Sequence, residues 1–492
     1  MKKIYAAIIS LLLIAILPSC SVNPVTGKKQ VSFMSESQEL AIGQQSDPAI
    51  IGEFGLYNDS ILQRFIQKKG EAMGLISHRP DLKYNFRVVD SPILNAFAVP
   101  GGYVYFTRGI MGYFNDEAQF AGVLGHEIGH ITARHAAQQQ TKQILTQIAF
   151  IGGMIASEKF RNMSESAMQA MQLLFLKYSR EDESQSDELG VKYSSSIGYD
   201  AVHMADFFKT LERYSEKEGA RVPEFMSTHP DPGNRYVRVT QLAKEYQQAN
   251  HLSNLAVNRD AYLRMIDGII YGEDPRQGYL DKSTNTFYHP EMKFQFPVPS
   301  GWQFQNSPGA VQCANQEGTA AIVLTLSSQK TFQAATQEIL QSYEMNIVGT
   351  PTSTTLNGIQ AYSFYAEQAQ QTTTTTTTSS QSADIVAMQT TLYNYNGNIY
   401  VLQGMSYKKD FATNKNIFST SLNGFKALTD PAKINVIPEK IKVVQVMQNA
   451  SLKDVLLFNK MPTSRLEELA ILNGMQQTDN VPAGSLIKIV VK

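Results

Sequence analysis

Residues 126–130 read His-Glu-Ile-Gly-His, which places two histidines four positions apart and a glutamate beside the first. On an α-helix this spacing projects both imidazoles from one face, about 6 Å apart, where they can bind one tetrahedral zinc ion. Glu127 can then reach a water molecule at the metal and take its proton. Chance predicts only about 0.01 such patterns in a chain of this composition. A helix with two unrelated buried or solvated histidines is therefore the weaker interpretation.

A catalytic zinc ion needs a third protein ligand and one open position. The segment 178–190 offers Glu183 and Asp187, which lie at i and i+4 on one helical face. One of these carboxylates can bind the metal while the other accepts the second ring N–H of a ligand histidine. The composition of the segment by itself favours a solvated acidic surface, so the pattern alone leaves the third ligand open.

The helix that carries the two histidines is predicted to begin at a capping box formed by Asp116 and Gln119. Apolar side chains cover much of its surface, so we expect it to be buried. A second capping box, Ser35 with Gln38, predicts a helix to about residue 45.

One part departs from the mainly helical pattern, because residues 86–89 and 103–106 predict strands around a proline and paired glycines. An edge strand can bind an extended substrate through its backbone. Gly101, Gly102 and Tyr103 are therefore candidate substrate-binding residues. A purely structural hairpin is the alternative.

The chain has 492 residues, of which 43% are hydrophobic, so we expect about three domains with cores of their own. Its 43 basic and 44 acidic residues leave a net charge of −1, which indicates no nucleic-acid partner. Two cysteines, Cys20 and Cys313, are too few for a disulfide scaffold.

The N-terminus resembles a bacterial lipoprotein signal. Two lysines precede an apolar run at 4–17 that is too short to span a bilayer, and Leu-Pro-Ser-Cys20 follows. The resemblance implies removal of residues 1–19, lipid attachment to Cys20 and a tether at 20–34. An uncleaved apolar anchor is the alternative. A second apolar stretch, at 144–156, predicts a buried or interfacial helix.

Two further units are predicted after the helical region. Residues 284–432 alternate strand-like and helical segments, which indicates an α+β domain with a flexible Thr-rich loop at 372–380. Residues 436–492 resemble a small βααβ LysM-like module, and this resemblance implies binding of N-acetylglucosamine-containing glycans such as peptidoglycan. A structural or partner-binding cap is the alternative.

Several motifs in one order resemble the HtpX-like zinc metallopeptidases, specifically their periplasmic lipoprotein branch. The motifs are Asn-Pro-Val-Thr-Gly at 23–27, the stretch 95–102, the His-Glu-Ile-Gly-His helix, Ser-Arg-x-x-Glu-x-x-x-Asp at 179–187, and Ser-Thr-His-Pro-Asp-Pro-Gly-Asn-Arg at 227–235. The resemblance implies a mainly α-helical gluzincin metallopeptidase domain over 35–275 with a small β-sheet.

The resemblance also implies roles for individual residues and one zinc ion (Zn2+) per chain. The implied metal ligands are His126, His130 and Glu183. Glu127 is the implied catalytic base, and Asp187 is the carboxylate that orients a ligand histidine. His229 is either a donor to the tetrahedral oxyanion or a displaceable fourth zinc ligand, and Arg235 either stabilises the same charge or braces its loop.

Together with the N-terminal signal, the resemblance predicts a multidomain zinc endopeptidase, lipid-anchored on the periplasmic face of the cell envelope, with the outer membrane as the expected membrane. Its expected partners are unfolded or misassembled envelope proteins, the membrane through Cys20, and peptidoglycan through 436–492. The alternatives are a chaperone-like assembly factor whose zinc site is closed by His229, and a cell-wall adaptor that uses the zinc fold as a scaffold.

Overall fold

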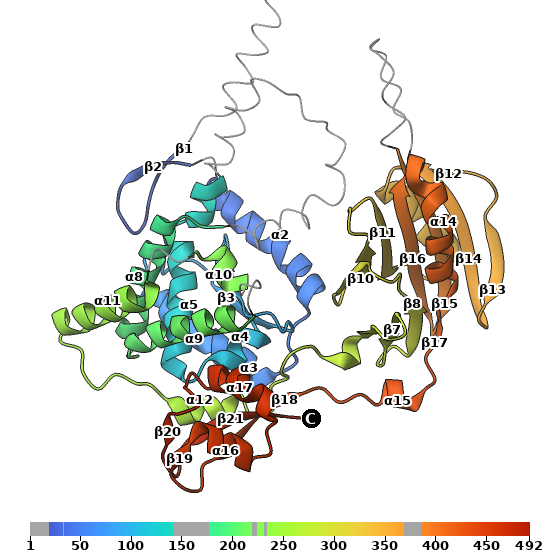
Figure 1. The fold of residues 1–492 in the computed structure, drawn as a ribbon. Coiled ribbons are helices and arrows are strands. Elements are labelled where there is room, and N and C mark those ends of the chain that lie inside the picture. Colours follow the sequence, from blue (N-terminus) through green and yellow to red (C-terminus); the bar gives the residue numbers. More distant parts are fainter. Residues whose placement is uncertain (1–18, 33, 141–176, 219–223, 231–233, 369–384) are drawn as a thin grey trace, which may run out of the picture.

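The computed structural model describes residues 19–32, 34–140, 177–218, 224–230, 234–368 and 385–492. Figure 1 shows a mainly helical part and a β-rich part, with the C-terminal segment, in red, against the helical part. Residues 1–18 of the predicted signal, the apolar stretch 144–156 and the Thr-rich loop 372–380 lie outside the described residues. Among the described residues, no helix combines the length and apolar character needed to cross a bilayer.

The predicted multidomain architecture with helices and several sheets is confirmed. The helices of the helical part are α2 (Glu36–Phe54), α3 (Ser60–Leu75), α4 (Arg108–Tyr113), α5 (Glu117–Thr132), α8 (Arg180–Ser196), α9 (Val202–Glu218), α10 (Glu224–Thr228), α11 (Arg235–Ala249) and α12 (Arg259–Met265). Helix α5 lies at the centre of this part, and all of its residues are buried. Its N-cap is Asp116, whose side chain accepts a hydrogen bond from the backbone N–H of Gln119 at 2.8 Å, as the sequence predicts. The return bond of the predicted capping box is not made, because the Gln119 side-chain oxygen accepts from the backbone N–H of Asn115 at 2.9 Å.

A three-stranded sheet in the order β3-β5-β4 packs beside α5. Its strands are β3 (Asn85–Val89), β4 (Ala96–Val99) and β5 (Tyr103–Thr107). Because β5 pairs with both neighbours, the prediction that the strand at Gly101, Gly102 and Tyr103 lies at an edge is wrong. The edge strand next to α5 is β4. The sequence analysis misses β4 because its four residues are all buried and show no alternation.

Helix α2 begins as predicted, with Ser35 and Gln38 in a capping box. It continues to Phe54, well beyond the predicted end near residue 45. Pro48 lies inside the helix and cannot donate to the carbonyl four residues earlier. That carbonyl belongs to Gln44, which is exposed, so water can satisfy it and the helix continues.

Most of the predicted tether at 20–34 is described by the structure, and it contains a hairpin. Strands β1 (Ser19–Val22) and β2 (Lys29–Ser32) form an antiparallel hairpin. In the turn between them, the Asn23 side-chain amide donates a 3.1 Å hydrogen bond to the carbonyl of Ala133, just after α5. The Asn23 side-chain oxygen accepts from the backbone N–H of Val25 at 2.9 Å, which shapes the turn. The predicted tether is therefore a folded element bound to the end of the central helix.

The β-rich part has the α+β composition predicted for 284–432. Its elements are β6 (Tyr279–Asp281), β7 (Thr286–His289), β8 (Phe294–Pro297), β9 (Gln303–Asn306), β10 (Ala310–Ala314), β11 (Ala320–Leu326), α13 (Phe332–Ser342), β12 (Met345–Ile347), β13 (Thr352–Leu356), β14 (Ile359–Gln368), β15 (Val386–Tyr395), β16 (Asn398–Tyr407), α14 (Lys408–Asn423) and β17 (Lys426–Ala427). One eight-stranded and one four-stranded sheet result. Two clusters of buried apolar side chains belong to this part alone. We call it the middle unit.

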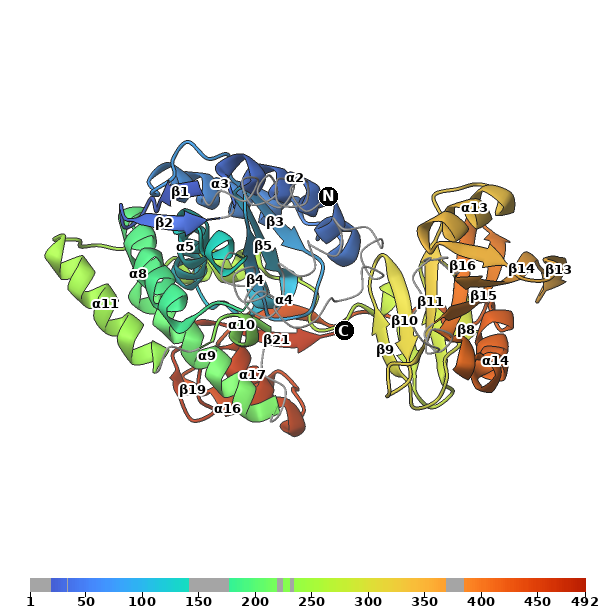
Figure 2. The same cartoon turned by 90° about the horizontal axis from the view of Figure 1, so that it is seen from above.

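The C-terminal segment has the predicted βααβ order. Its main elements are β18 (Lys440–Gln445), α16 (Leu452–Phe458), α17 (Leu466–Leu472) and β21 (Leu486–Val491). Figure 2 shows this C-terminal unit beside α9, away from the middle unit. Its buried apolar side chains belong to the same cluster as those around α5. The buried Lys488 ammonium donates to the carbonyls of Gly112 and Phe114, at 2.9 and 3.0 Å, where α4 ends. The C-terminal unit is thus packed into the core of the helical part.

Candidate metal centre

Glycines allow α5 and α8 to approach each other closely. A Cβ on Gly125 would lie 2.9 Å from the carbonyl oxygen of Gly190, and a Cβ on Gly129 would lie 3.3 Å from the Cα of Ser186. Larger residues at these positions would push the helices apart. Helix α8 begins at a capping box on Ser179. The close approach brings its acidic face against the histidine face of α5.

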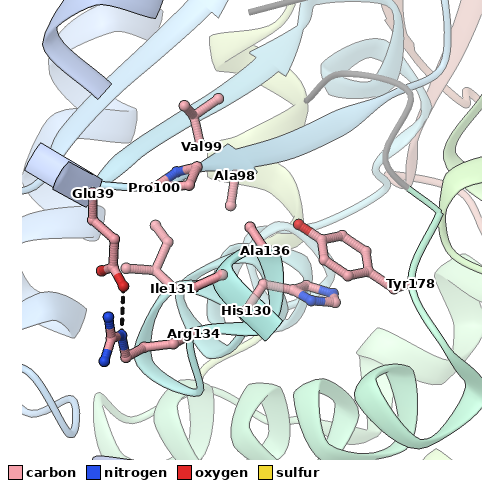
Figure 3. Close-up of a pocket in the computed structure, with 10 residues that line it drawn as sticks. Glu39, Ala98, Val99, Pro100, His130, Ile131, Arg134, Ala136 and Tyr178 are labelled. Carbon is pink, nitrogen blue, oxygen red and sulfur yellow. Dashed lines mark hydrogen bonds and ion pairs between the residues drawn. The ribbon is translucent and has the colours of Figure 1, made fainter. Parts of the chain in front are cut away.

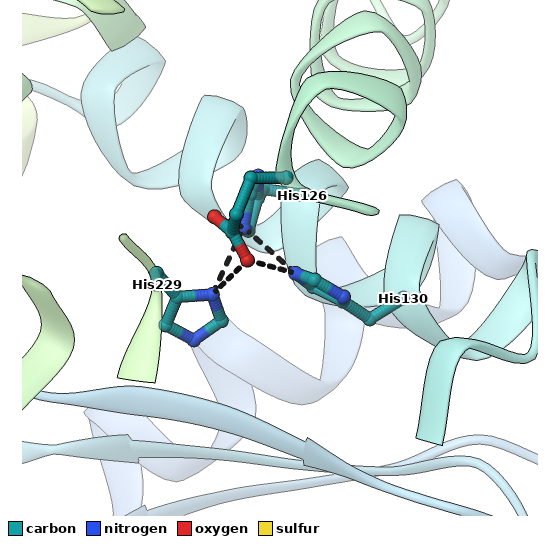
Figure 4. A group of neighbouring side chains, drawn as sticks. His126, His130 and His229 are labelled. Carbon is teal, nitrogen blue, oxygen red and sulfur yellow. Dashed lines mark hydrogen bonds and ion pairs between the residues drawn. The ribbon is translucent and has the colours of Figure 1, made fainter. Parts of the chain in front are cut away.

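Four buried side chains converge on one point between these helices, as Figure 4 shows. They are His126, His130, Glu183 and His229, and their ligand atoms lie within 4.8 Å of one another. The Nε2 atom of His126 is 2.9 Å from Nε2 of His130 and 3.3 Å from Nδ1 of His229. Glu183 Oε1 is 3.3 Å from Nε2 of His130 and 3.0 Å from Nδ1 of His229.

These separations can be compared with the geometry of zinc. Ligand atoms at about 2.0–2.1 Å from a tetrahedral ion lie about 3.3 Å from one another. The observed spacings are close to this value, and three imidazoles with one carboxylate are ligand types that zinc prefers. Glu127, whose side chain is completely buried, has no hydrogen-bond partner for either carboxylate oxygen among the described residues. The donor set and this unpartnered carboxylate fit a metal ion with a reactive water beside it.

Asp187 lies behind His126, on the side away from the cluster. Its Oδ1 is 3.0 Å from Nδ1 of His126, so the carboxylate holds the imidazole with Nε2 toward the cluster. Arg235, the first residue of α11, donates to Asp187 at 2.6 Å through its Nη2, and Arg238 also binds this carboxylate. The Arg235 guanidinium lies 3.9 Å from the ring centre of Phe208. In this arrangement Arg235 supports Asp187, and its Nη2 also lies 3.3 Å from Oε2 of Glu183.

The charges of the cluster depend on one another. Burial raises the pKa of the Glu127 carboxyl, which suits a group that must take up a proton. Burial acts on Glu183 in the same direction, but the positive charges of His229 and His126 outweigh it and hold the pKa of Glu183 well below its usual range. Burial would lower the pKa of His126, yet Glu183 and Asp187 raise it to about 9. A bound cation would take the place of the protons that these groups share.

His229 directly follows α10 and reaches the cluster from outside both α5 and α8. Its ring stacks on Phe225, with ring centres 4.5 Å apart, and its Nε2 is 3.7 Å from Glu127 Oε1. The Nδ1 atom lies at ligand distance from the other three side chains. Of the two roles predicted for His229, the geometry favours the fourth ligand over the oxyanion donor.

A small pocket lies beside His130, between α5 and the edge strand β4 (Figure 3). Its lining residues are Glu39, Ala98, Val99, Pro100, His130, Ile131, Arg134, Ala136, Ala137 and Tyr178. The predicted substrate residues lie elsewhere. A Cβ on Gly101 would lie 2.6 Å from the carbonyl oxygen of Glu39, and one on Gly102 would lie 2.7 Å from that of Lys83. These glycines permit close backbone packing, and β4 takes their place as the candidate substrate strand.

Two residues of this region were missed in the sequence analysis. Tyr178 stacks on His130, with ring centres 3.9 Å apart. His135 is buried against the Nδ1 edge of His130, with 3.0 Å between their Nδ1 atoms. The only sequence signal for His135 is its position five residues after His130, which on a continuous helix would point it away from the cluster.

The fold and the site together define a candidate metal centre between two antiparallel helices, α5 and α8. Residues 60–243 match the model of Peptidase family M48. The family match and the His-His-Glu-His cluster support zinc as the cofactor.

Three relatives illustrate the similarity. The Beta-barrel assembly-enhancing protease of Escherichia coli (strain K12) is 28% identical over 260 residues, which cover 50% of this chain and 51% of the relative. The Mitochondrial metalloendopeptidase OMA1 of Arabidopsis thaliana is 29% identical over 180 residues, 36% of this chain and 35% of that protein. Human Metalloendopeptidase OMA1 is 25% identical over 251 residues, 47% and 48% of the two chains. The chain thus spans about half the length, or less, of these relatives. At the level of class, the prediction of a zinc metalloendopeptidase is confirmed.

Proposed function

We propose that this protein is a lipid-anchored, zinc-dependent endopeptidase that hydrolyses peptide bonds in unfolded or misassembled proteins of the cell envelope. The observation that carries the proposal is the convergence of His126, His130 and Glu183 next to the buried carboxylate of Glu127, which has no hydrogen-bond partner among the described residues. A purely structural metal site has no use for such a carboxylate, because burial of a carboxylate without hydrogen bonds is costly.

The proposed ligands of the zinc ion are His126, His130, Glu183 and, at rest, His229. Bound zinc supplies a Lewis acid that polarises the scissile carbonyl and makes water more acidic. Glu127 takes the proton of the attacking water and returns it to the leaving nitrogen, a role that its raised pKa suits. Asp187 keeps His126 oriented, and Arg235 keeps Asp187 in place.

We further propose that the substrate lies along β4 as an added antiparallel strand. The backbone N–H of Thr107 donates to the carbonyl of Asn95, so the alternation of an antiparallel ladder turns the backbone groups of Ala96 and Ala98 toward the unpaired side. Ala98 also lines the pocket beside His130. Main-chain pairing at this edge would accept unfolded segments of many sequences.

The proposed location and substrates rest on the sequence and on one relative. The signal-like N-terminus supports lipid attachment at Cys20, and this is tested by membrane fractionation of the parent and Cys20→Ser, which should release the protein. The relative's name, Beta-barrel assembly-enhancing protease, supports a substrate class of outer-membrane β-barrel proteins that fail to assemble. Glycan binding by 436–492 has less support, because the buried side of this unit packs into the core around α5.

The experiment compares digestion of casein by the soluble fragment 21–492 and by Glu127→Gln, with bound zinc quantified in both. We expect one zinc ion per chain in each, cleavage by the parent, and a loss of at least about 10²-fold in rate for the variant. Equal cleavage by the two proteins would contradict the role of Glu127. A parent without zinc would contradict the proposal as a whole.

The position of His229 also favours a second candidate, a chaperone-like assembly factor whose zinc site stays closed. His229→Ala separates the two in the same assay. If His229 is a displaceable ligand of an active peptidase, the variant keeps its zinc and cleaves casein at least as fast as the parent. Bound zinc without cleavage in both parent and variant would favour the chaperone-like candidate.

A further inference from the structure

We propose that His135 is a positioning residue that fixes the metal-facing orientation of His130 through a relay of hydrogen bonds from His130 to His135 to Gln185. This inference rests on the proposed role of His130 as a zinc ligand. It concerns a side chain that contributes no ligand atom to the cluster and does not belong to the His-Glu-Ile-Gly-His pattern.

The distances define the relay. Nε2 of His130 faces the cluster, and its Nδ1 lies 3.0 Å from Nδ1 of His135. On the far side, Nε2 of His135 lies 2.9 Å from the side-chain oxygen of Gln185, on α8. His135 is only 1% exposed, so water does not compete with these contacts. Among the described residues, the carboxylate that forms an ion pair with His135 is Asp182, at 3.8 Å, which is too far for a hydrogen bond.

Hydrogen accounting allows one arrangement of the relay. A neutral imidazole has one N–H and one bare nitrogen. When Nε2 of His130 binds a metal, its hydrogen is on Nδ1, and this N–H can bond only to a bare Nδ1 of His135. The hydrogen of His135 is then on Nε2, where the Gln185 oxygen accepts it. Ser186 Oγ, at 3.3 Å from the same Nδ1, is the more distant donor to that nitrogen.

The backbone conformation that presents His135 is unusual. Arg134 has φ = 60°, a left-handed conformation that ends the helix and turns the next residue back toward His130. Arg134 is held by an ion pair with the buried Glu39 and by a 2.8 Å hydrogen bond to the carbonyl of Met34. The strain of this turn is therefore supported by α2 and the segment before it, which is consistent with a position that serves the site.

The two ligand histidines of α5 are supported differently. Behind His126 stands an anion, Asp187, with two arginines around it. Behind His130 stands a neutral imidazole. Removing a hydrogen-bond partner of a metal-bound histidine typically lowers metal affinity about 10–100-fold. A neutral partner orients the His130 ring without adding another negative charge to a centre that already holds the carboxylates of Glu183 and Glu127.

The test measures zinc affinity of the full chain by competition with a chromophoric chelator. His135→Leu keeps the approximate size but removes both nitrogens, and we expect about 10–100-fold weaker zinc binding. His135→Asn should recover most of this loss, because its amide oxygen can stand where Nδ1 stood and accept from His130. His289→Asn, a half-buried histidine in the middle unit, is the matched control and should bind zinc like the parent.

A second variant and an NMR measurement on the parent test the relay even if His135→Leu does not fold. Gln185→Met should weaken zinc binding by less than about tenfold, and combined with His135→Leu it should add nothing further, because both act through one relay. Nitrogen-15 NMR of labelled imidazoles in the zinc-loaded parent should find the hydrogen of His135 on Nε2.

The outcomes separate this inference from the proposed function. If the parent binds one zinc ion but a folded His135→Leu binds it equally tightly, or if the hydrogen of His135 is on Nδ1, the relay is overturned and the peptidase proposal stands. If His135→Leu does not fold, an unchanged zinc affinity of Gln185→Met overturns the relay. A parent that binds no zinc overturns the proposed function itself.

Discussion

The two units that follow the helical part relate to it in opposite ways. The middle unit holds its own two clusters of buried apolar side chains. The C-terminal unit holds none of its own, since its buried leucines and isoleucines belong to the cluster around α5. Both look like separate domains in the sequence. The comparison teaches that a compact βααβ segment can be a late part of a catalytic core instead of an attached module.

Backbone pairing shows how one chain accommodates both units. The N–H of Tyr271 donates to the carbonyl of Glu439 at 2.8 Å, and Ile270 pairs with Lys440. Residues on either side of the middle unit are therefore neighbours across a short antiparallel ladder. In topological terms the middle unit is an insertion between two segments of the same core.

Two deletions should show the largest difference between the middle unit and the C-terminal unit. Replacing residues 273–437 with a short Gly-Ser linker of about four residues joins backbones that already pair. We expect this protein to keep one zinc ion per chain and its activity on casein. Deleting 436–492 instead removes part of the core around α5, so we expect loss of cooperative unfolding and of zinc binding. Zinc titration and thermal unfolding of both proteins provide the measurement. A stable, zinc-binding product of the second deletion would refute the shared core.

A matched pair of substitutions, one in the core of each unit, should show the same difference with a smaller loss of stability. Leu469 in α17 and Leu402 in β16 are both completely buried. Each Leu→Ala change should lower the free energy of unfolding by about 2–5 kcal/mol. Calorimetry with and without zinc distinguishes the two variants. Leu469→Ala should shift the unfolding transition that depends on zinc, whereas Leu402→Ala should shift only a transition that does not depend on zinc. A zinc-dependent transition that responds equally to both would contradict separate cores.

The smallest expected effect is the contribution of Lys488 to the pH dependence of folding stability. Burial, with a contribution from Arg259, lowers the pKa of the Lys488 ammonium well below its usual 10.5. Between the lowered pKa and 10.5 the unfolded chain holds a proton that the folded chain lacks, so stability rises with pH in this window. The slope from this group is at most about 1.4 kcal/mol per pH unit.

Chemical denaturation of the parent and Lys488→Met at pH 8, 9 and 10 measures this slope. Lys488→Met retains an apolar stem but cannot titrate, so its stability should rise less steeply with pH than that of the parent. Parallel curves for the two proteins would show that Lys488 keeps its proton in the folded state.

Much of the candidate site could be predicted because it depends on local periodicity. The spacing of His126 and His130, the cap at Asp116 and the i,i+4 pair Glu183 and Asp187 are all features of single helices. The helical face that each residue occupies follows directly from its position. Helix α8 then meets α5 as the expected ligand geometry requires.

What the sequence does not predict depends on tertiary contacts. His135 reaches His130 only because Arg134 adopts a left-handed conformation that Glu39 supports from a distant helix. Strand β4 has no alternation because both of its faces are buried. The contact of the C-terminal unit with the helical part includes the buried Lys488, a residue whose type normally indicates a solvated surface.

The contact of Lys488 with Gly112 also has a consequence for the order in which the protein folds. The two residues are 376 positions apart, so one of the groups that secure the start of α5 is synthesised only after the middle unit. Contacts of such long sequence separation slow folding. The core around α5 therefore acquires its final packing only after the whole middle unit has been synthesised.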